Sequence, residues 1–229
     1  MKTAEHHVHV RRTARYFTAG KINAETKYLW FLLHGYGQLA NHFISKFDCL
    51  DPVRNFLVAP EGLSKFYRNG FAGNVAASWM TKADRENEID DYLFFLNKLY
   101  REIVPISVPR KFKINLLGFS QGAATASRWL CRSGLPFDNF IIYSGDLGND
   151  IDVIDENLPL RNSRNFYIRG NEDEFIDSKY AENFKELFQK AKIQLEFISF
   201  KGKHEIKEVA MRELLARLDS SNVINPESQ

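Results

Sequence analysis

Apolar or alternating runs take turns with amphipathic segments along most of the chain after residue 27. The former are the predicted strands, at residues 27–33, 55–59, 112–117, 139–143, 165–169 and 194–200. The latter are the predicted helices, at residues 85–104, 121–133, 178–191 and 205–219. Strands that alternate with helices pair in parallel, because each helix carries the chain back to the same edge of the sheet. The alternation therefore predicts an α/β fold with a mostly parallel central sheet and helices on both faces.

The remaining segments complete this pattern. Residues 8–17 alternate imperfectly and predict an antiparallel edge strand. Asp84 and Pro105 are expected to begin and end the helix at 85–104. The last nine residues, 221–229, are polar, so we expect a frayed tail after a single domain that spans residues 1–220.

The composition argues against several classes of protein. Basic and acidic residues number 31 and 29, and a net charge of +2 without a long run of like charge is not the pattern of a nucleic-acid-binding protein. The longest strongly apolar run, residues 28–33, is too short to span a bilayer, and no basic amphipathic helix offers a membrane-docking face. The first residues lack the apolar core of a secretory signal, and the two cysteines lack the spacing of a redox or zinc motif. We therefore expect a cytoplasmic protein with no nucleic-acid partner and no stable membrane association.

The motif that carries chemistry is Gly118-Phe119-Ser120-Gln121-Gly122. It lies between a predicted strand and a predicted helix, which is the setting that the G-x-S-x-G pattern requires. The serine must sit on a sharp, strained turn, and the glycines are needed where neighbouring backbone passes too close for a side chain. A tight structural turn is the alternative. We predict that Ser120 is a nucleophile.

A serine hydroxyl is a poor nucleophile until a base takes its proton. In this arrangement the chain order is serine, acid, histidine. Only one histidine follows Ser120, namely His204, in the turn between the last predicted strand and the last predicted helix. The other five are His6, His7, His9, His34 and His42. His204 is therefore the predicted base, and His34 is expected to be a structural hydrogen-bonding residue.

The acid that orients the histidine should lie between them, in a loop after a strand. The strand at 165–169 leads into an acidic loop that contains Glu172 and Asp173, and Asp146 follows the strand at 139–143. The residues alone do not separate Asp173 from Glu172, and Asp146 stays a third choice.

Acyl transfer also needs N–H donors aimed at the developing oxyanion. The serine turn supplies the backbone N–H of Gln121, at a helix N-terminus. The loop Leu33-His34-Gly35-Tyr36-Gly37, which follows another predicted strand, supplies the second, and we expect it to be the N–H of Tyr36.

Together these segments resemble the α/β-hydrolase fold and, more narrowly, the phospholipase/carboxylesterase family that includes the acyl-protein thioesterases. The resemblance is carried by LHGYG at 33–37, SWM at 78–80, GFSQG at 118–122, GNEDEFI at 170–176 and GKH at 202–204. It implies hydrolysis of a carboxylic ester or thioester through an acyl-enzyme, without a metal or an organic cofactor. It also selects Asp173, because the second Asp of the family's G-D-x-D-P-x-V pattern falls there.

The chain departs from that pattern at three positions. Asn171 replaces the first Asp, Glu174 replaces the Pro, and Arg169 stands where the family often has His. The aromatic-rich segment 60–81 is specific to this chain, and in relatives this region helps to line the acyl pocket. The candidate substrate-binding residues are accordingly Trp79, Phe119 and Phe71, with core packing as the alternative for each.

The expected partner is a small-molecule ester or thioester. A homodimer is common in the family that the chain resembles, and the sequence leaves the oligomeric state open. Other interpretations are another α/β-hydrolase chemistry, such as a peptidase, and a binding protein of this fold that has lost catalysis. A peptidase of this fold often carries an extra domain, for which 229 residues leave no room. An inactive relative would usually lack a triad member, whereas a serine, an acid and a histidine are present here in order.

Overall fold

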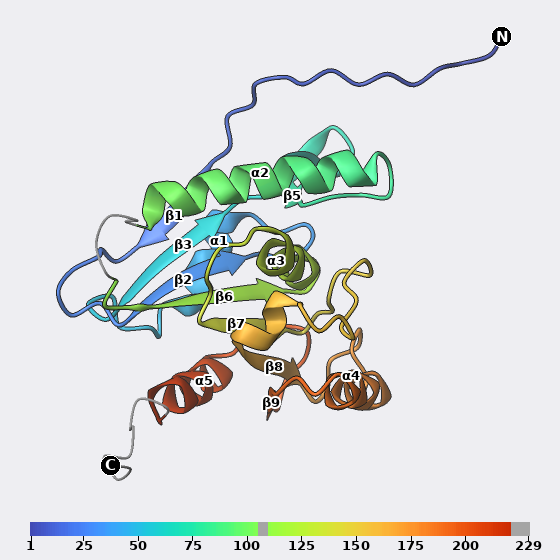
Figure 1. Cartoon of the computed structure of the whole chain (residues 1–229). Helices are drawn as coiled ribbons and strands as arrows, with labels where there is room; N and C mark the ends of the chain where they lie inside the picture. Colours follow the sequence, from blue (N-terminus) through green and yellow to red (C-terminus); the bar gives the residue numbers. More distant parts are fainter. Residues whose placement is uncertain (105–109, 221–229) are drawn as a thin grey trace.

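The computed structural model describes residues 1–104 and 110–220. Its main sheet has the strand order β1-β3-β2-β6-β7-β8-β9, and every pairing is parallel except that of β1 with β3 (Figure 1). The strands are β1 (Tyr16–Ala19), β2 (Tyr28–Leu33), β3 (Asn55–Pro60), β6 (Lys113–Phe119), β7 (Asn139–Tyr143), β8 (Arg164–Gly170) and β9 (Leu195–Phe200). The predicted mostly parallel sheet is confirmed.

Two layers of apolar side chains cover the two faces of this sheet. All six residues of β2 are buried, because alternate side chains point into opposite layers. One layer packs against α2 (Arg85–Ile103), α3 (Gln121–Arg132), the 3₁₀ turn η2 (Pro159–Asn162) and α4 (Ser178–Lys190). The other packs against α1 (Ala40–Ile44), the 3₁₀ turn η1 (Ser45–Phe47) and α5 (Glu208–Ser220). Helices therefore lie on both faces, as predicted.

A second, two-stranded sheet was not predicted. It is the antiparallel hairpin of β4 (Ser64–Asn69) and β5 (Ala72–Ser78), which lies outside the main sheet. Most of its side chains are exposed, so its sequence lacks the apolar periodicity that indicates a strand.

Several element ends differ from the predictions. The antiparallel edge strand exists, but it covers Tyr16–Ala19 rather than residues 8–17. Asp84 precedes α2 in the left-handed conformation and makes no side-chain cap; its carboxylate instead accepts a 2.6 Å hydrogen bond from the Asn87 amide. The last helix begins at Glu208 and not at residue 205. The predicted helix stop at Pro105 and the predicted tail at 221–229 lie outside the described residues.

Candidate active site

Ser120 occupies a sharp turn between β6 and α3. Its backbone has φ +53° and ψ −121°, a conformation that costs a non-glycine residue free energy and that clusters at functional sites. The flanking glycines are sterically required. A Cβ on Gly118 would overlap the backbone of Gly122 and Ala123, and one on Gly122 would overlap the carbonyl oxygen of Leu33. The G-x-S-x-G pattern therefore has the structural context that was expected of it.

His204 and Asp173 are brought together across 31 residues of sequence. His204 Nδ1 lies 2.9 Å from Asp173 Oδ2 and 3.1 Å from Oδ1. The Asp173 side chain is fully buried, whereas that of His204 keeps a small exposed fraction. The imidazole lies between two aromatic rings, with centroids 4.9 Å from Phe119 and 4.8 Å from Phe175. Since Phe119 directly precedes Ser120, the histidine lies beside the serine turn, although no hydrogen bond joins His204 to Ser120 in the described residues.

The Asp173 carboxylate is held in its charged form. Burial acts to raise its pKa, but hydrogen bonds from the Phe175 amide and from His204, together with the nearby Ser144 hydroxyl, outweigh burial and lower the pKa below its ordinary value. Ser144 Oγ is itself buried and lacks hydrogen-bond geometry to any partner in the described residues, so its influence on Asp173 is one of proximity. Residue 144 gave no sequence signal, because a serine after a strand is common.

The turns that carry the acid and the histidine are joined by backbone hydrogen bonds. The Asn171 amide donates to Phe200 O and the Glu172 amide to Gly202 O, both at 2.9 Å. Asn171 Oδ1 accepts from the Gly202 amide at 3.3 Å, a role that the carboxylate of the family's Asp could also fill. These contacts fix the spacing between Asp173 and His204 without the family's proline.

Arg169 reaches across the base of the acid loop. Its guanidinium donates to the Ile176 carbonyl at 2.6 Å and to the Ser178 hydroxyl at 3.0 Å. The departure from histidine at this position therefore supplies two further links between β8 and the start of α4. The sequence alone could not have revealed this, because the partners lie seven and nine residues further along the chain.

The two predicted oxyanion donors both lie next to the serine turn. Neither the Gln121 N–H nor the Tyr36 N–H has a protein acceptor among the described residues. Gly35 holds their loops close together, since a Cβ there would lie 3.1 Å from the Ser120 Cβ. The two amides are thus available to a ligand oxygen.

The Gln121 side chain has a separate role. Its amide donates to Met80 O at 2.9 Å, and its oxygen accepts from the Trp79 amide at 3.1 Å. This side chain therefore fixes the segment after β5 onto the serine turn, which explains the proximity of the distant S-W-M and G-F-S-Q-G segments.

The other predicted residues occupy different environments. His34 is buried, its pKa is lowered by that burial, and its ring bonds to Gly35 O and the Gly62 amide, in keeping with the expected structural role. Trp79 is 1% exposed and donates to His34 O at 2.8 Å, so it supports the site from beneath and has no surface left for a substrate. Phe119 is also buried, against His204, whereas Phe71 is fully exposed at the tip of the hairpin. Only Phe71 of these three presents its ring to solvent.

The two alternative acids are placed elsewhere. Glu172 is exposed and is fixed by its backbone. Asp146 accepts a hydrogen bond from the Tyr180 hydroxyl. Neither carboxylate contacts His204, so the geometry favours Asp173, the choice that the resemblance made.

A comparison with protein-family models finds the phospholipase/carboxylesterase model over residues 17–222. The chain belongs to this family. The match spans β1 through α5, including every segment that forms the candidate site. A search among curated proteins returns no match.

Several solved structures have the same fold. The acyl-protein thioesterase 2 of Zea mays superposes with a TM-score of 0.66 at 16% identity, covering 91% of this chain and 99% of that one. The Bacillus cereus carboxylesterase gives 0.64 at 15% identity, with 91% and 94% covered. A phospholipase/carboxylesterase from Dyadobacter fermentans gives 0.62 at 20% identity, with 88% and 94% covered. At these identities the likeness shows the fold alone, here the α/β-hydrolase fold.

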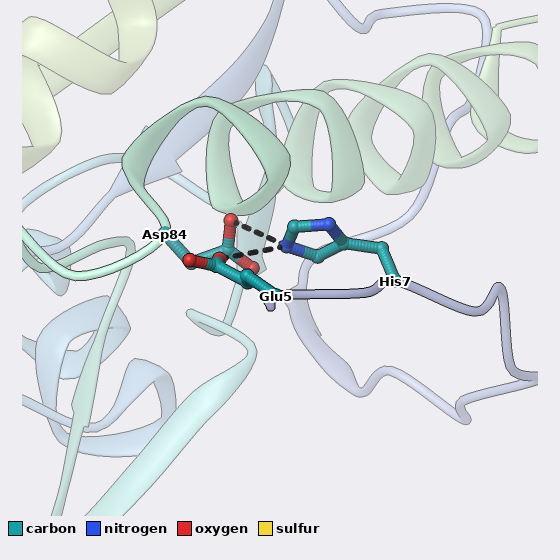
Figure 2. Close-up of side chains that lie close together, drawn as sticks. All are labelled: Glu5, His7 and Asp84. Carbon is teal, nitrogen blue, oxygen red and sulfur yellow. Dashed lines mark hydrogen bonds and ion pairs between the residues drawn. The ribbon is translucent and has the colours of Figure 1, made fainter. Parts of the chain in front are cut away.

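One group of metal-compatible side chains lies within the described residues, away from Ser120 and His204. His7 Nε2 is 3.2 Å from both Glu5 Oε1 and Asp84 Oδ1, where the N-terminal segment passes the start of α2 (Figure 2). All three side chains are substantially exposed, and the contacts of the His7 ring nitrogen with the two carboxylates account for their approach. No described helix is both long and apolar enough to cross a membrane.

Proposed function

We propose that this chain is a serine hydrolase that cleaves carboxylic esters or thioesters through an acyl-enzyme. The observation that carries the proposal is the hydrogen bond between Asp173 and His204 beside a strained serine turn. Membership of the phospholipase/carboxylesterase family supports the same reaction class. Proteins of the same fold include a thioesterase and a carboxylesterase, which suggest the bond that is cleaved but not the substrate.

In the proposed first step, Ser120 Oγ attacks the carbonyl carbon while His204 Nε2 accepts its proton. The carbonyl π electrons move to the oxygen, and the Gln121 and Tyr36 amides stabilise the negative charge there. Asp173 accepts a hydrogen bond from Nδ1–H of the imidazole. This bond fixes the tautomer in which Nε2 is free to accept the serine proton. The tetrahedral intermediate then collapses, and the leaving alcohol or thiol departs with the proton that His204 carries.

In the second step a water molecule acts as the nucleophile, the role that the serine hydroxyl has in the first step. His204 accepts a proton from the water, the resulting hydroxide adds to the acyl carbon, and the Ser120–acyl bond breaks with return of that proton to Oγ. The products are a carboxylic acid and the regenerated serine. Every proton transfer uses the same imidazole, so the proposal requires no metal and no organic cofactor.

The test compares wild type with Ser120→Ala on p-nitrophenyl esters from acetyl to palmitoyl. We expect turnover by wild type and a loss of about three orders of magnitude or more in the variant, with an unchanged circular-dichroism spectrum. A fluorophosphonate probe should label the wild type at Ser120 only. Absence of both hydrolysis and labelling would favour the alternative, a binding protein of the hydrolase fold.

A further inference from the structure

A pocket of about 490 Å³ opens between the Tyr36–Gly37 loop, α1 and the β4–β5 hairpin. Its polar lining consists of Gln38, His42, Lys46, Arg68 and Asn74. We call this the cationic pocket. Its volume lies within the usual range for small-molecule sites.

The lining is one-sided in charge. His42, Lys46 and Arg68 can each carry a positive charge, and no aspartate or glutamate lines the pocket. None of the three pairs with an acidic side chain within residues 1–104 and 110–220. Cations without counterions in a concave site attract anions, because the walls focus their field.

A second, larger cavity shows the contrast. It encloses about 780 Å³ at the opposite edge of the sheet, where the strands begin, and it also contains basic side chains. There, however, Arg110 and Lys113 share Asp138 and Arg164 pairs with Glu196, so the charge is partly compensated. The unpaired positive charge therefore distinguishes the cationic pocket from this second cavity.

The cationic pocket adjoins the candidate oxyanion donor. Arg68 donates a hydrogen bond to Gly37 O, and Gly37 is the residue after Tyr36. Gly37 has a φ of +72°, a left-handed conformation that favours glycine. Gly37 lines the pocket and directly follows Tyr36, so the pocket adjoins the loop that carries the candidate oxyanion donor.

We propose that the cationic pocket binds an anionic group of the substrate, a carboxylate or a phosphate, a few bonds away from the ester or thioester that is cleaved. This inference rests on the proposed hydrolase function and narrows it from esters in general to negatively charged esters. Arg68 offers the planar fork that pairs with two anion oxygens, while Lys46 and His42 add point donors.

The first experiment measures charge preference in hydrolysis. The substrates are the mono-p-nitrophenyl ester of adipic acid and its methyl-capped counterpart, which has the same reacting bond but no charge. A second pair, 4-acetoxybenzoate and its methyl ester, places the charge on the leaving group. For at least one pair we expect wild type to prefer the charged member about tenfold in kcat/KM, and we expect 1 M salt to reduce that preference, because it shortens the screening length to about 3 Å.

A charge reversal tests the pocket itself. Lys46→Glu should lower the ratio of kcat/KM for the charged ester to kcat/KM for the neutral ester at least about fivefold. A fivefold change corresponds to the upper part of the range measured for one exposed ion pair. Lys98→Glu is the matched control, because Lys98 is exposed on α2 and changes the net charge equally outside the pocket. A neutral-ester preference in both pairs, or equal loss in the two variants, would overturn the proposal.

A binding measurement separates this proposal from the hydrolase proposal. Calorimetry with Ser120→Ala compares monomethyl adipate with dimethyl adipate, and adds competition by inorganic phosphate and by acetate. If the anionic ester binds and Lys46→Glu weakens that binding, the result supports the pocket even if no ester is turned over. The stronger of the two competitors then identifies the class of anion that the pocket binds. Hydrolysis of neutral esters without any binding of the anionic ligand would leave the hydrolase function standing and refute the pocket.

Discussion

The two halves of the candidate site are built in different ways. The half that carries Asp173 and His204 consists of short turns after β8 and β9, joined by backbone hydrogen bonds at 2.9 Å. The half formed by the Tyr36 loop, α1 and the β4–β5 hairpin exposes most of its hairpin side chains. A fixed acid–base pair thus faces a more open surface, which suggests that the chemistry is set by the first half and the choice of substrate by the second.

The largest effect is expected from breaking the fixed half. Asp173→Asn keeps the shape of the side chain but favours the wrong imidazole tautomer, so kcat should fall about 10³- to 10⁴-fold. The measurement is steady-state kinetics on a short-chain ester. Glu172→Gln is the control, because Glu172 is exposed and contacts no imidazole, and it should stay near wild type. A loss below tenfold for Asp173→Asn would remove Asp173 from the triad.

The same substitution has a signature in stability against pH. Because the folded-state pKa of Asp173 is lowered, its carboxylate stabilises the fold above the ordinary carboxyl pKa, and this contribution is lost as pH falls through the folded value. The difference in unfolding free energy between wild type and Asp173→Asn should therefore shrink from pH 7 toward pH 3. Denaturant titrations at both pH values check this, and a difference that grows on acidification would contradict it.

Substitutions of Trp79 test whether this residue belongs to the protein core or to the substrate-binding half of the site. The indole is 1% exposed and donates to His34 O, so Trp79→Ala should destabilise the protein by about 3–5 kcal/mol. Trp79→Phe, which keeps most of the volume, should cost less. Chemical denaturation gives both values. A variant of wild-type stability with a raised KM would instead return Trp79 to the substrate-binding group.

A smaller effect is expected at the junction of the acid and histidine turns. Asn171→Ala removes the acceptor for the Gly202 amide and should cost about 0.5–1.5 kcal/mol of stability. Asn171→Asp, the residue typical of the family, retains an acceptor and should recover most of that loss. Equal stabilities for both variants would mean that the backbone bonds alone hold the turns.

The smallest effect on stability is expected at the tip of the open half. Phe71 is fully exposed, so Phe71→Ser should change the unfolding free energy by no more than about 0.5 kcal/mol. If Phe71 contacts acyl chains, KM for an octanoyl ester should rise while KM for an acetyl ester stays constant. Identical KM values for both esters would rule out the predicted substrate contact.

The fixed half was the more predictable one. The order of Ser120 and His204 along the chain, and their position after strands, follow from apolar runs and a short motif, which are local signals. Parallel pairing then brings the ends of β6, β8 and β9 to one edge of the sheet. The choice of Asp173 over Glu172 needed the family pattern, because the two carboxylates are adjacent in sequence and differ only in how the loop folds.

The open half was predicted less well because its structure depends on contacts between distant residues. The hairpin has no apolar alternation, so β4 and β5 were missed. The burial of Trp79 and the Gln121 contacts that hold its segment likewise depend on residues about 40 positions apart in sequence. The positive side chains of the cationic pocket come from separate parts of the chain. His42 lies on α1, whereas Arg68 lies on β4, a strand that the sequence did not indicate. No spacing in the sequence connects Lys46 with Arg68.

The strand order has a consequence for how the chain acquires its fold during synthesis. β2 pairs with β3 on one side, but its other neighbour is β6, and their register joins Tyr28 to Lys113. Until the ribosome has released residue 119, the β2 edge, apolar throughout, has no partner for its backbone groups, and unpaired strand edges of this kind invite association with other chains. A chaperone that shields the first hundred residues would therefore protect the chain over the interval in which this edge is unpaired.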